Sequence, residues 1–189
     1  IADGKKHPVI VNVYGGPHAQ RVTNSWRSKN LYFQYMAQQG YVIFQLDNRG
    51  SYNRGKKFED AIYKHLGVVE VADQIKGVEF LRTLDYVDPQ RIGIYGHSYG
   101  GYMALMAMFK AGDYFQAGVS GAPVTDWALY DTHYTERYLG HPKTNAKGYE
   151  DSAVFPYADG LKGPLMIYHG MADDNVLFTH ATKLFKQLQ

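Results

Sequence analysis

The sequence "RIGIYGHSYGGYMALMAMFK", residues 91 to 110, joins two apolar segments through a cluster of glycines. The first segment is short and rich in isoleucine, which is typical of a buried strand, and the second has the length and composition of a helix. Between them, Ser98 has Gly96 two residues before it and Gly100 two residues after it, a G-x-S-x-G pattern. The pattern predicts a sharp turn from strand to helix with a serine at its apex.

Two interpretations of Ser98 remain open from this motif alone. A nucleophile at a strained turn needs neighbours without side chains, because the chain must fold back closely on itself. The same glycines could instead form a turn that only packs a helix against a sheet, since G-x-S-x-G also occurs by chance. The position between strand and helix favours the nucleophile, because the N–H groups of a helix that begins at Tyr99 would face an oxyanion formed above the serine.

The rest of the chain alternates short apolar runs with segments of helical period, as in a parallel sheet with crossover helices. The predicted strands are almost continuously apolar, as expected of strands buried on both faces. They cover residues 8–14, 40–46, 91–95, 116–121 and 164–170. Helices are expected over about 29–39, 68–84, 99–111 and 177–189. The fold class is therefore α/β, a mostly parallel sheet with helices on both faces.

Composition limits the classes of function. The chain has 189 residues, 45% of them hydrophobic and 20% charged, which fits one globular domain. Its net charge is only +2 and the basic residues are scattered, so nucleic acid is not an expected partner. It has no cysteine, and its eight histidines include no H-E-x-x-H spacing, so neither a metal nor another cofactor is expected. These features leave the cellular compartment open.

Residues 122–163 break the alternation, being long, rich in Tyr, Asp and Pro, and without a predicted strand. Long irregular segments in compact domains are usually functional. Within this segment Trp127, Tyr130 and Tyr134 recur at spacings of three and four, so one helical turn could bring them to a common face. Such a stripe is most often core, but its place after a strand end, near Ser98, favours the wall of a pocket.

A serine nucleophile needs a base and an acid that orients the base, and in this fold class both are expected after the serine. Asp173 and Asp174 directly follow the last predicted strand, at the edge where open α/β sheets bind ligands. Both could cap the next helix, and for Asp174 capping is the favoured interpretation; Asp173 is assigned as the acid. We interpret Asp47 and Arg49 as loop-fixing residues, and His97 as a packing residue.

Several motifs together resemble the catalytic domain of the prolyl oligopeptidase family of serine peptidases. They are "GHSYGGY" (96–102), "HGMADDNV" (169–176), "VYGGP" (13–17) and "DNRGS" (47–51). The stretch "APVTDWALYDTHYTERYLG" (122–140) is most similar to the dipeptidyl peptidase IV branch, including its bacterial members. The resemblance implies an α/β-hydrolase fold over residues 1–189, taken as a single catalytic domain fragment.

The resemblance also implies roles for individual residues. Ser98 would be the nucleophile and Asp173 the triad acid, with the Tyr14 phenol and the Tyr99 backbone N–H stabilising the oxyanion. From the residues alone, Tyr14 could equally end its strand for packing reasons, although the glycines after it favour function. Asn175 would hydrogen bond the carbonyl before the proline. The residues matching the proline-ring pocket are Tyr99, Val124, Trp127, Tyr130, Tyr134 and Val176.

The function expected from this resemblance is that of a serine exopeptidase, which removes Xaa-Pro dipeptides from peptide N-termini through an acyl-enzyme on Ser98. A broader serine hydrolase, such as an acylaminoacyl peptidase or an esterase, and a catalytically incompetent fragment are the alternatives. The only histidine after Asp173 is His180, which lies well into the helix leaving the site. The resemblance implies that the triad histidine lies beyond Gln189, together with the last strand and helix of the fold, so we expect an inactive fragment.

The resemblance has implications for the surroundings of the domain as well. It implies a β-propeller domain upstream of this chain, a peptide substrate and a homodimer. Similarity to the bacterial members implies a periplasmic or extracytoplasmic location.

Overall fold

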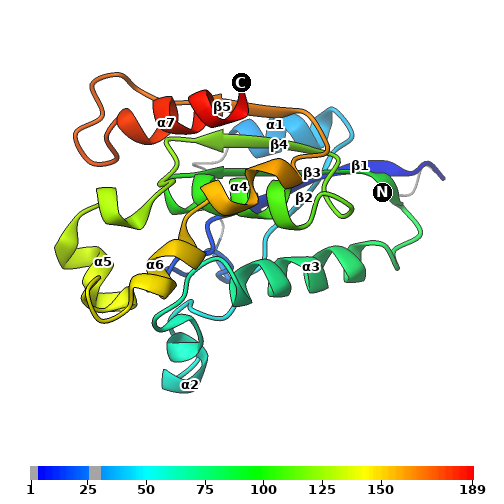
Figure 1. The fold of residues 1–189 in the computed structure, drawn as a ribbon. Helices are drawn as coiled ribbons and strands as arrows, with labels where there is room; N and C mark the ends of the chain where they lie inside the picture. Colours follow the sequence, from blue (N-terminus) through cyan, green and yellow to red (C-terminus); the bar gives the residue numbers. More distant parts are fainter. Residues whose placement is uncertain (1–3, 26–30) are drawn as a thin grey trace.

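The computed structural model describes residues 4–25 and 31–189 (Figure 1). Their strands form one sheet in the order β2-β1-β3-β4-β5. All neighbouring strands in it are parallel, so their carboxyl ends meet at one edge. The strands are β1 (His7–Val13), β2 (Val42–Phe44), β3 (Val87–His97), β4 (Ala117–Gly121) and β5 (Leu165–Tyr168).

Helices cover both faces of this sheet. The α-helices are α1 (Leu31–Gln38), α2 (Lys56–Glu59), α3 (Val69–Leu81), α4 (Tyr99–Lys110), α5 (Thr132–Leu139), α6 (Ala146–Ser152) and α7 (Thr179–Leu188). Short 3-10 helices are η1 (Asp60–Ile62), η2 (Trp127–Leu129) and η3 (Phe155–Gly160). Helices α3 and α4 lie in front of the sheet in Figure 1 and α1 lies behind it, beside β2.

Helix α4 is the centre of the core. Every residue from Tyr99 to Phe109 is buried. The helix packs on β3 and β4 with one side and on α3 and η3 with others. A helix surrounded in this way needs apolar residues all round, which explains why the sequence after Ser98 has no polar face. The burial of α4 fixes the position of its first residue relative to the sheet.

The register of the sheet brings three chain segments to the same edge. Strand β1 pairs with β3 up to Val13 and Gly96. Strand β3 in turn pairs with β4 up to His97 and Gly121. The residues that follow these strands, Tyr14 and Ser98 among them, therefore emerge side by side at the carboxyl edge of the sheet.

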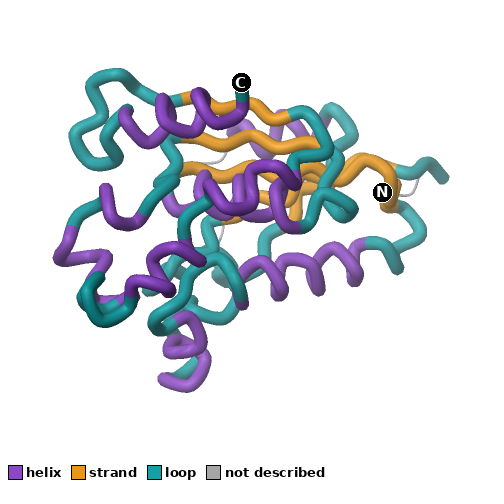
Figure 2. The backbone as a smooth tube through the Cα atoms, viewed as in Figure 1, coloured by secondary structure: helices purple, strands orange, loops and turns teal. Residues whose placement is uncertain are grey.

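The predicted α/β class and parallel sheet are confirmed, with helices on both faces. Strand β3 is longer than predicted because it begins at Val87, and β2 is reduced to Val42–Phe44. Residues 122–163 contain helices and loops but no strand, as expected (Figure 2). The first residues of the predicted helix 29–39 lie outside the described residues. No helix within the described ranges is long and apolar enough to cross a bilayer.

Candidate active site

Ser98 lies at the turn between β3 and α4 with φ 61° and ψ −121°. This left-handed φ is uncommon for a residue with a side chain. The turn is closed by backbone contacts at both glycines of the motif. A Cβ on Gly96 would lie 2.1 Å from the Gly100 carbonyl oxygen, and a Cβ on Gly100 would lie 2.3 Å from the Val13 carbonyl oxygen. Because both obstacles are backbone atoms, glycine is required at both positions, as the motif predicts.

Backbone hydrogen bonds hold this turn against the neighbouring strand and helix. The Ser98 N–H donates to the Gly121 carbonyl oxygen at the end of β4, at 2.9 Å. Its carbonyl oxygen accepts the N–H of Tyr102 at 3.0 Å, the first hydrogen bond of α4. The N–H of Tyr99 at the first position of α4 consequently has no acceptor within the helix. It is available for a ligand at the carboxyl edge of the sheet.

Tyr14 follows β1 and lies beside this turn. Its ring centroid is 6.1 Å from that of Tyr99, and the guanidinium carbon of Arg21 lies 4.5 Å from its own ring centroid. Burial raises the pKa of Tyr14, although the nearby charge of Arg21 lowers it. In the described part of the chain nothing hydrogen bonds to the Tyr14 hydroxyl. The phenol is therefore protonated at neutral pH and free to donate a hydrogen bond.

A cavity of about 830 Å³ opens at this edge and is lined by Tyr14, Arg21, His97 and Ser98, among others. Its polar lining and its contact with Ser98 make it the space where a substrate could approach the hydroxyl. His97, expected to be a packing residue, stacks on Tyr168 with ring centroids 6.0 Å apart. It is nevertheless exposed and faces the same cavity as Ser98.

Asp173 follows β5, two strands from β3 in the sheet. Its Oδ1 atom accepts the N–H groups of Asn175 at 3.1 Å and Val176 at 3.0 Å. Partial burial by itself would raise the pKa of Asp173, but these two hydrogen bonds and the positive potential of His169 and His97 lower it below its ordinary value. The loop thus holds an ionised carboxylate, whose second oxygen, Oδ2, lies 3.5 Å from Nε2 of His169.

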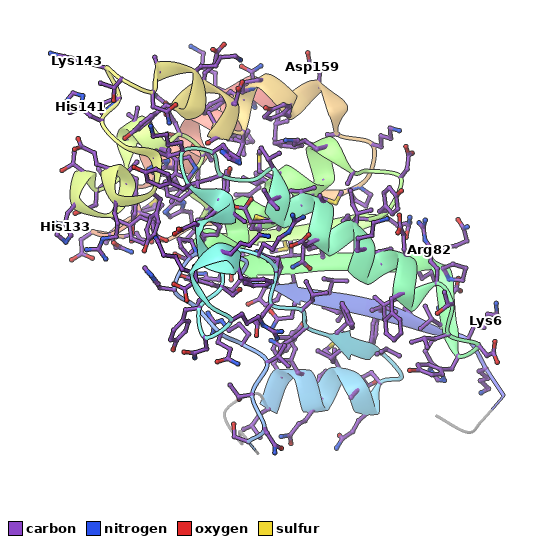
Figure 3. The ribbon with its side chains drawn as sticks, turned by 90° about the horizontal axis from the view of Figure 1, so that it is seen from below. Lys6, Arg82, His133, His141, Lys143 and Asp159 are labelled. Carbon is purple, nitrogen blue, oxygen red and sulfur yellow. The ribbon has the colours of Figure 1, made fainter. Side chains whose placement is uncertain are left out.

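No histidine in the ranges 4–25 and 31–189 hydrogen bonds to Ser98 or Asp173. The His169 ring is buried, donates from Nε2 to the Val176 carbonyl oxygen at 2.6 Å, and lies 3.5 Å from Asp173. His180 is also buried, and its Nδ1 accepts the Thr125 N–H at 3.0 Å. His133 and His141 project outward at one end of the molecule (Figure 3). Within the described residues, Ser98 and Asp173 thus both follow strands at the carboxyl edge of the sheet, and no imidazole hydrogen bonds to either of them.

Four of the predicted pocket residues form an aromatic cluster beside Ser98. Trp127 lies 5.4 Å from Tyr99, 5.8 Å from Tyr130 and 6.2 Å from Tyr134 between ring centroids, and it is nearly parallel to Tyr134. Asn175 joins the cluster because its side-chain oxygen accepts the Tyr130 hydroxyl at 3.1 Å. The two valines of the predicted set, Val124 and Val176, are buried in the core.

The prediction that one helical turn carries these aromatic residues is wrong. Trp127 belongs to η2 and Tyr134 to α5, and Tyr130 between them is extended. Two aspartates divide the segment, because Asp126 caps η2 by accepting the Ala128 N–H and Asp131 caps α5 by accepting the Tyr134 N–H. The rings still meet, since the two short helices are joined at the extended residue.

The structure also corrects the favoured role of Asp174. Helix α7 begins at Thr179 with Phe178 at its N-cap, so Asp174 lies too early to cap it. The cluster "DNRGS" has the structural role that we expected, with different partners. Asp47 accepts the N–H groups of Arg21 and Val22. Arg49 forms its ion pair with Asp73 on α3, 2.6 Å away.

Sequence analysis missed two buried polar residues next to the site. Glu70 on α3 accepts the Tyr99 hydroxyl at 2.8 Å. Asn48, after β2, donates to the carbonyl oxygen of Gly15, the residue after Tyr14, at 3.0 Å. The sequence feature that could have identified Glu70 as a buried residue is its position among apolar residues in a predicted helix. Within the described ranges, no three acidic or histidine side chains are grouped closely enough to hold a metal ion.

A serine at a strained strand-to-helix turn, with donors and a carboxylate at the carboxyl edge of a parallel sheet, is the arrangement of an α/β-hydrolase. The sequence profile of the prolyl oligopeptidase family matches residues 26–189. Human dipeptidyl peptidase 8 is 43% identical across 100% of this chain, which covers 22% of that protein. Dipeptidyl peptidase 4 of Trichophyton equinum is 41% identical across 97% of the chain, which covers 24% of it.

Solved structures that are similar to this chain are also described as dipeptidyl peptidases. A protein from Bacteroides ovatus described as a dipeptidyl aminopeptidase IV superposes with a TM-score of 0.94 at 47% identity, over 97% of this chain and 26% of that one. Dipeptidyl peptidase 4 of Porphyromonas gingivalis superposes with a TM-score of 0.92 at 40% identity, over 98% and 26%. The chain belongs to the prolyl oligopeptidase family, and the α/β-hydrolase fold is confirmed. It spans about a quarter of the length of these relatives.

Proposed function

We propose that this chain carries the serine site of a dipeptidyl peptidase that removes Xaa-Pro dipeptides from peptide N-termini. The observation that carries the proposal is the placement of Ser98, at a strained turn directly beside an aromatic cluster. The strained turn exposes a hydroxyl where the first N–H of a helix and a phenol can serve an oxyanion. The aromatic rings provide a rigid, flat wall suited to a proline ring.

The proposed reaction is nucleophilic catalysis in two stages. The Ser98 Oγ attacks the carbonyl carbon of the proline residue, and its proton passes to a base. The oxyanion of the tetrahedral intermediate accepts hydrogen bonds from the Tyr14 hydroxyl and the Tyr99 N–H. The C–N bond then breaks, the amine leaves with the proton from the base, and water hydrolyses the ester on Ser98. Asp173 orients the base and stabilises its cationic form.

The pocket residues have distinct roles in this proposal. Trp127, Tyr130 and Tyr134 form the wall against the proline ring. Asn175, held by Tyr130 at 3.1 Å, turns its side-chain amide toward the peptide carbonyl that precedes the proline. Val124 and Val176 support the wall from the core side. The peptide is thereby fixed on both sides of the bond that lies before the proline.

We propose further that residues 1–189 alone are inactive and that a histidine from outside this range supplies the base. The support is geometric, because no described imidazole hydrogen bonds to Ser98, and Nδ1 of His180 already accepts the Thr125 N–H. The family resemblance adds a β-propeller domain and a homodimer to the complete protein. Relatives about four times as long as this chain leave room for the propeller domain.

The test of the proposed function is labelling of the complete protein with a fluorophosphonate, followed by peptide mapping. We expect Ser98 to be the labelled residue, and Ser98→Ala to abolish both labelling and hydrolysis of a chromogenic Xaa-Pro substrate. Label on another serine, or activity that survives Ser98→Ala, would contradict the proposal. Equal hydrolysis of N-acylated and free N-terminal substrates would identify a broader serine hydrolase instead.

A further inference from the structure

Helix α3 carries two polar side chains on the face that it turns toward the core. Glu70 and Gln74 are four residues apart, so they lie one turn apart on the same side of the helix. Their exposed fractions are 0% and 1%. Burial of a carboxylate and an amide is unfavourable unless hydrogen bonds satisfy them. The hydrogen-bond partners of Glu70 and Gln74 therefore indicate the role of these two residues.

Glu70 holds the side chain of Tyr99. Its Oε1 atom accepts the Tyr99 hydroxyl at 2.8 Å and the Gly67 N–H at 2.9 Å, and its Oε2 atom accepts the Val68 N–H at 3.1 Å. The two backbone donors fix the carboxylate in the loop before α3. The carboxylate in turn fixes the far end of the Tyr99 ring, whose near end begins α4 beside Ser98. Tyr99 is thus held from both ends.

Gln74 holds the turn that carries Tyr14, through one intermediate residue. Its Nε2 atom donates to the Asn48 side-chain oxygen at 3.0 Å. Asn48 is 1% exposed, and its Nδ2 atom donates to the Gly15 carbonyl oxygen at 3.0 Å, so it connects Gln74 to Gly15. Gly15 directly follows Tyr14 and has φ 76°. This chain of hydrogen bonds fixes the turn after β1 from its buried side.

We propose that Glu70 and Gln74 are positioning residues that hold the two oxyanion donors, Tyr99 and Tyr14, at a fixed separation from one rigid helix. The inference rests on the proposed function, since it assigns the oxyanion to these two tyrosines. Donors that are fixed before the reaction stabilise the transition state without reorganising. Displacement of either donor should therefore lower kcat and leave KM nearly unchanged.

Gln74 is tested by a double-mutant cycle in the complete protein, with kcat expressed per site titrated by fluorophosphonate. We expect Gln74→Met to lower kcat on the order of tenfold, the scale of a small misplacement of a catalytic group. In a Tyr14→Phe background the same change should have almost no further effect, because the group that it positions is gone. Lys76→Met, on the exposed face of the same helix, is the matched control and should keep full kcat.

Glu70 is tested in the same way against its own partner. Glu70→Gln and Tyr99→Phe each disturb the hydrogen bond between the two side chains, so each should lower kcat. The kcat of the double variant should be no lower than that of the slower single variant, because both changes disturb the same hydrogen bond. Glu70→Gln should remain additive with Tyr14→Phe, since Glu70 acts on the other donor. Should Glu70→Gln fail to fold, Tyr99→Phe removes the same hydrogen bond from the opposite side.

The outcomes separate this inference from the proposed function. A wild-type protein that is not labelled at Ser98 would contradict the proposed function and the inference with it. A Tyr14→Phe variant with unchanged kcat would remove the oxyanion role of Tyr14 and overturn the inference, while the assignment of Ser98 as nucleophile would stand. A labelled, active wild type in which Tyr14→Phe is impaired, but Gln74→Met keeps full kcat, would overturn the inference alone. Equal losses from Gln74→Met in both backgrounds would mean a general structural role and would also overturn it.

Discussion

At the scale of single residues, the site depends on backbone conformation as much as on side-chain chemistry. A non-glycine residue in a sparsely populated region, as Ser98 is, costs about 1–3 kcal/mol, and its surroundings must hold it there. The holding groups are the hydrogen bonds to Gly121 and Tyr102 and the close backbone contacts at the two glycines of the motif. The G-x-S-x-G spacing predicted this arrangement from the sequence because glycine is the residue that permits such contacts.

The first prediction concerns Gly100. In Gly100→Ala the added Cβ would meet the Val13 carbonyl oxygen at 2.3 Å, and a backbone atom cannot turn aside as a side chain can. We expect a loss of about 3 kcal/mol or more in the free energy of unfolding, the upper range for overpacking. Chemical denaturation measures it. Gly170→Ala, where no atom lies within 4 Å of the added Cβ, is the control and should change stability little.

The second prediction concerns the Tyr14 hydroxyl. Because it has no partner among the described residues and lies beside the Ser98 turn, Tyr14→Phe should leave the fold intact. In the complete protein we expect kcat to fall on the order of 10²–10³, as for removal of one oxyanion donor, with little change in KM. Steady-state kinetics of wild type and Tyr14→Phe on an Xaa-Pro substrate test this expectation. Unchanged kcat would make Tyr14 a packing residue.

At the scale of elements, short helices and loops build the pocket, and here the sequence was less informative. The spacing of Trp127, Tyr130 and Tyr134 suggested one helix, because an aromatic period of three and four is the same in a continuous helix and in two short ones. Asp126 and Asp131 carried the missing information, since each is a preferred N-cap and each caps a separate helix. The acid Glu70 could not be placed, because its partner Tyr99 lies on another element.

The third prediction concerns the wall that these elements form. Tyr130→Ala would remove a ring that contacts Trp127 and Tyr134 and would also free Asn175. A rigid ring gains most from a preformed flat pocket, so kcat/KM should fall more for substrates with proline at the cleaved position than for those with phenylalanine. Parallel assays of the two substrates test this. Equal losses would show that the wall has no preference for proline.

The fourth prediction concerns the contact between α7 and the segment after β4. Burial lowers the pKa of His180 to about 4 in the folded state, against about 6.5 when unfolded. A depressed histidine pKa means that the unfolded state binds the proton first, so stability falls as pH drops from about 6.5 toward 4 and then levels off. Between pH 7 and 5 the loss from His180 should be about 2 kcal/mol.

Unfolding in urea at both pH values measures this loss. His180→Gln lacks the titrating group, so the difference in stability between wild type and variant should shrink by that amount at pH 5. A difference that is the same at both pH values would show that His180 does not titrate in this range.

At the scale of the whole molecule, the class of fold was predictable and the arrangement of its strands was not. Continuous apolar runs separated by helical segments identify a parallel sheet, because only strands covered on both faces are apolar throughout. The order β2-β1-β3-β4-β5 depends on which buried strands are neighbours, and their apolar residues are too alike to show it. Likewise, Asp173 was placed near Ser98 by the rule that ligands bind at the carboxyl edge, not by any local pattern.

The fifth prediction concerns residues 1–189 as an isolated polypeptide. Without an imidazole at Ser98 the hydroxyl stays protonated, and only the contribution of the oxyanion donors and of binding remains. We expect the isolated polypeptide to be slower than the complete protein by several orders of magnitude on a chromogenic Xaa-Pro substrate. Comparable kcat values, abolished by His180→Ala, would place the base at His180 after all.

The carboxyl edge of the sheet gathers its groups from both ends of the chain, with Tyr14 after β1 and Asp173 after β5. Contacts between such distant segments form late in folding, because the long intervening loop must close first. A chain emerging from the ribosome therefore cannot bring Tyr14, Ser98 and Asp173 to the same edge until β5 has joined the sheet. The topology by itself therefore makes the assembly of this edge one of the last steps in the folding of the described residues.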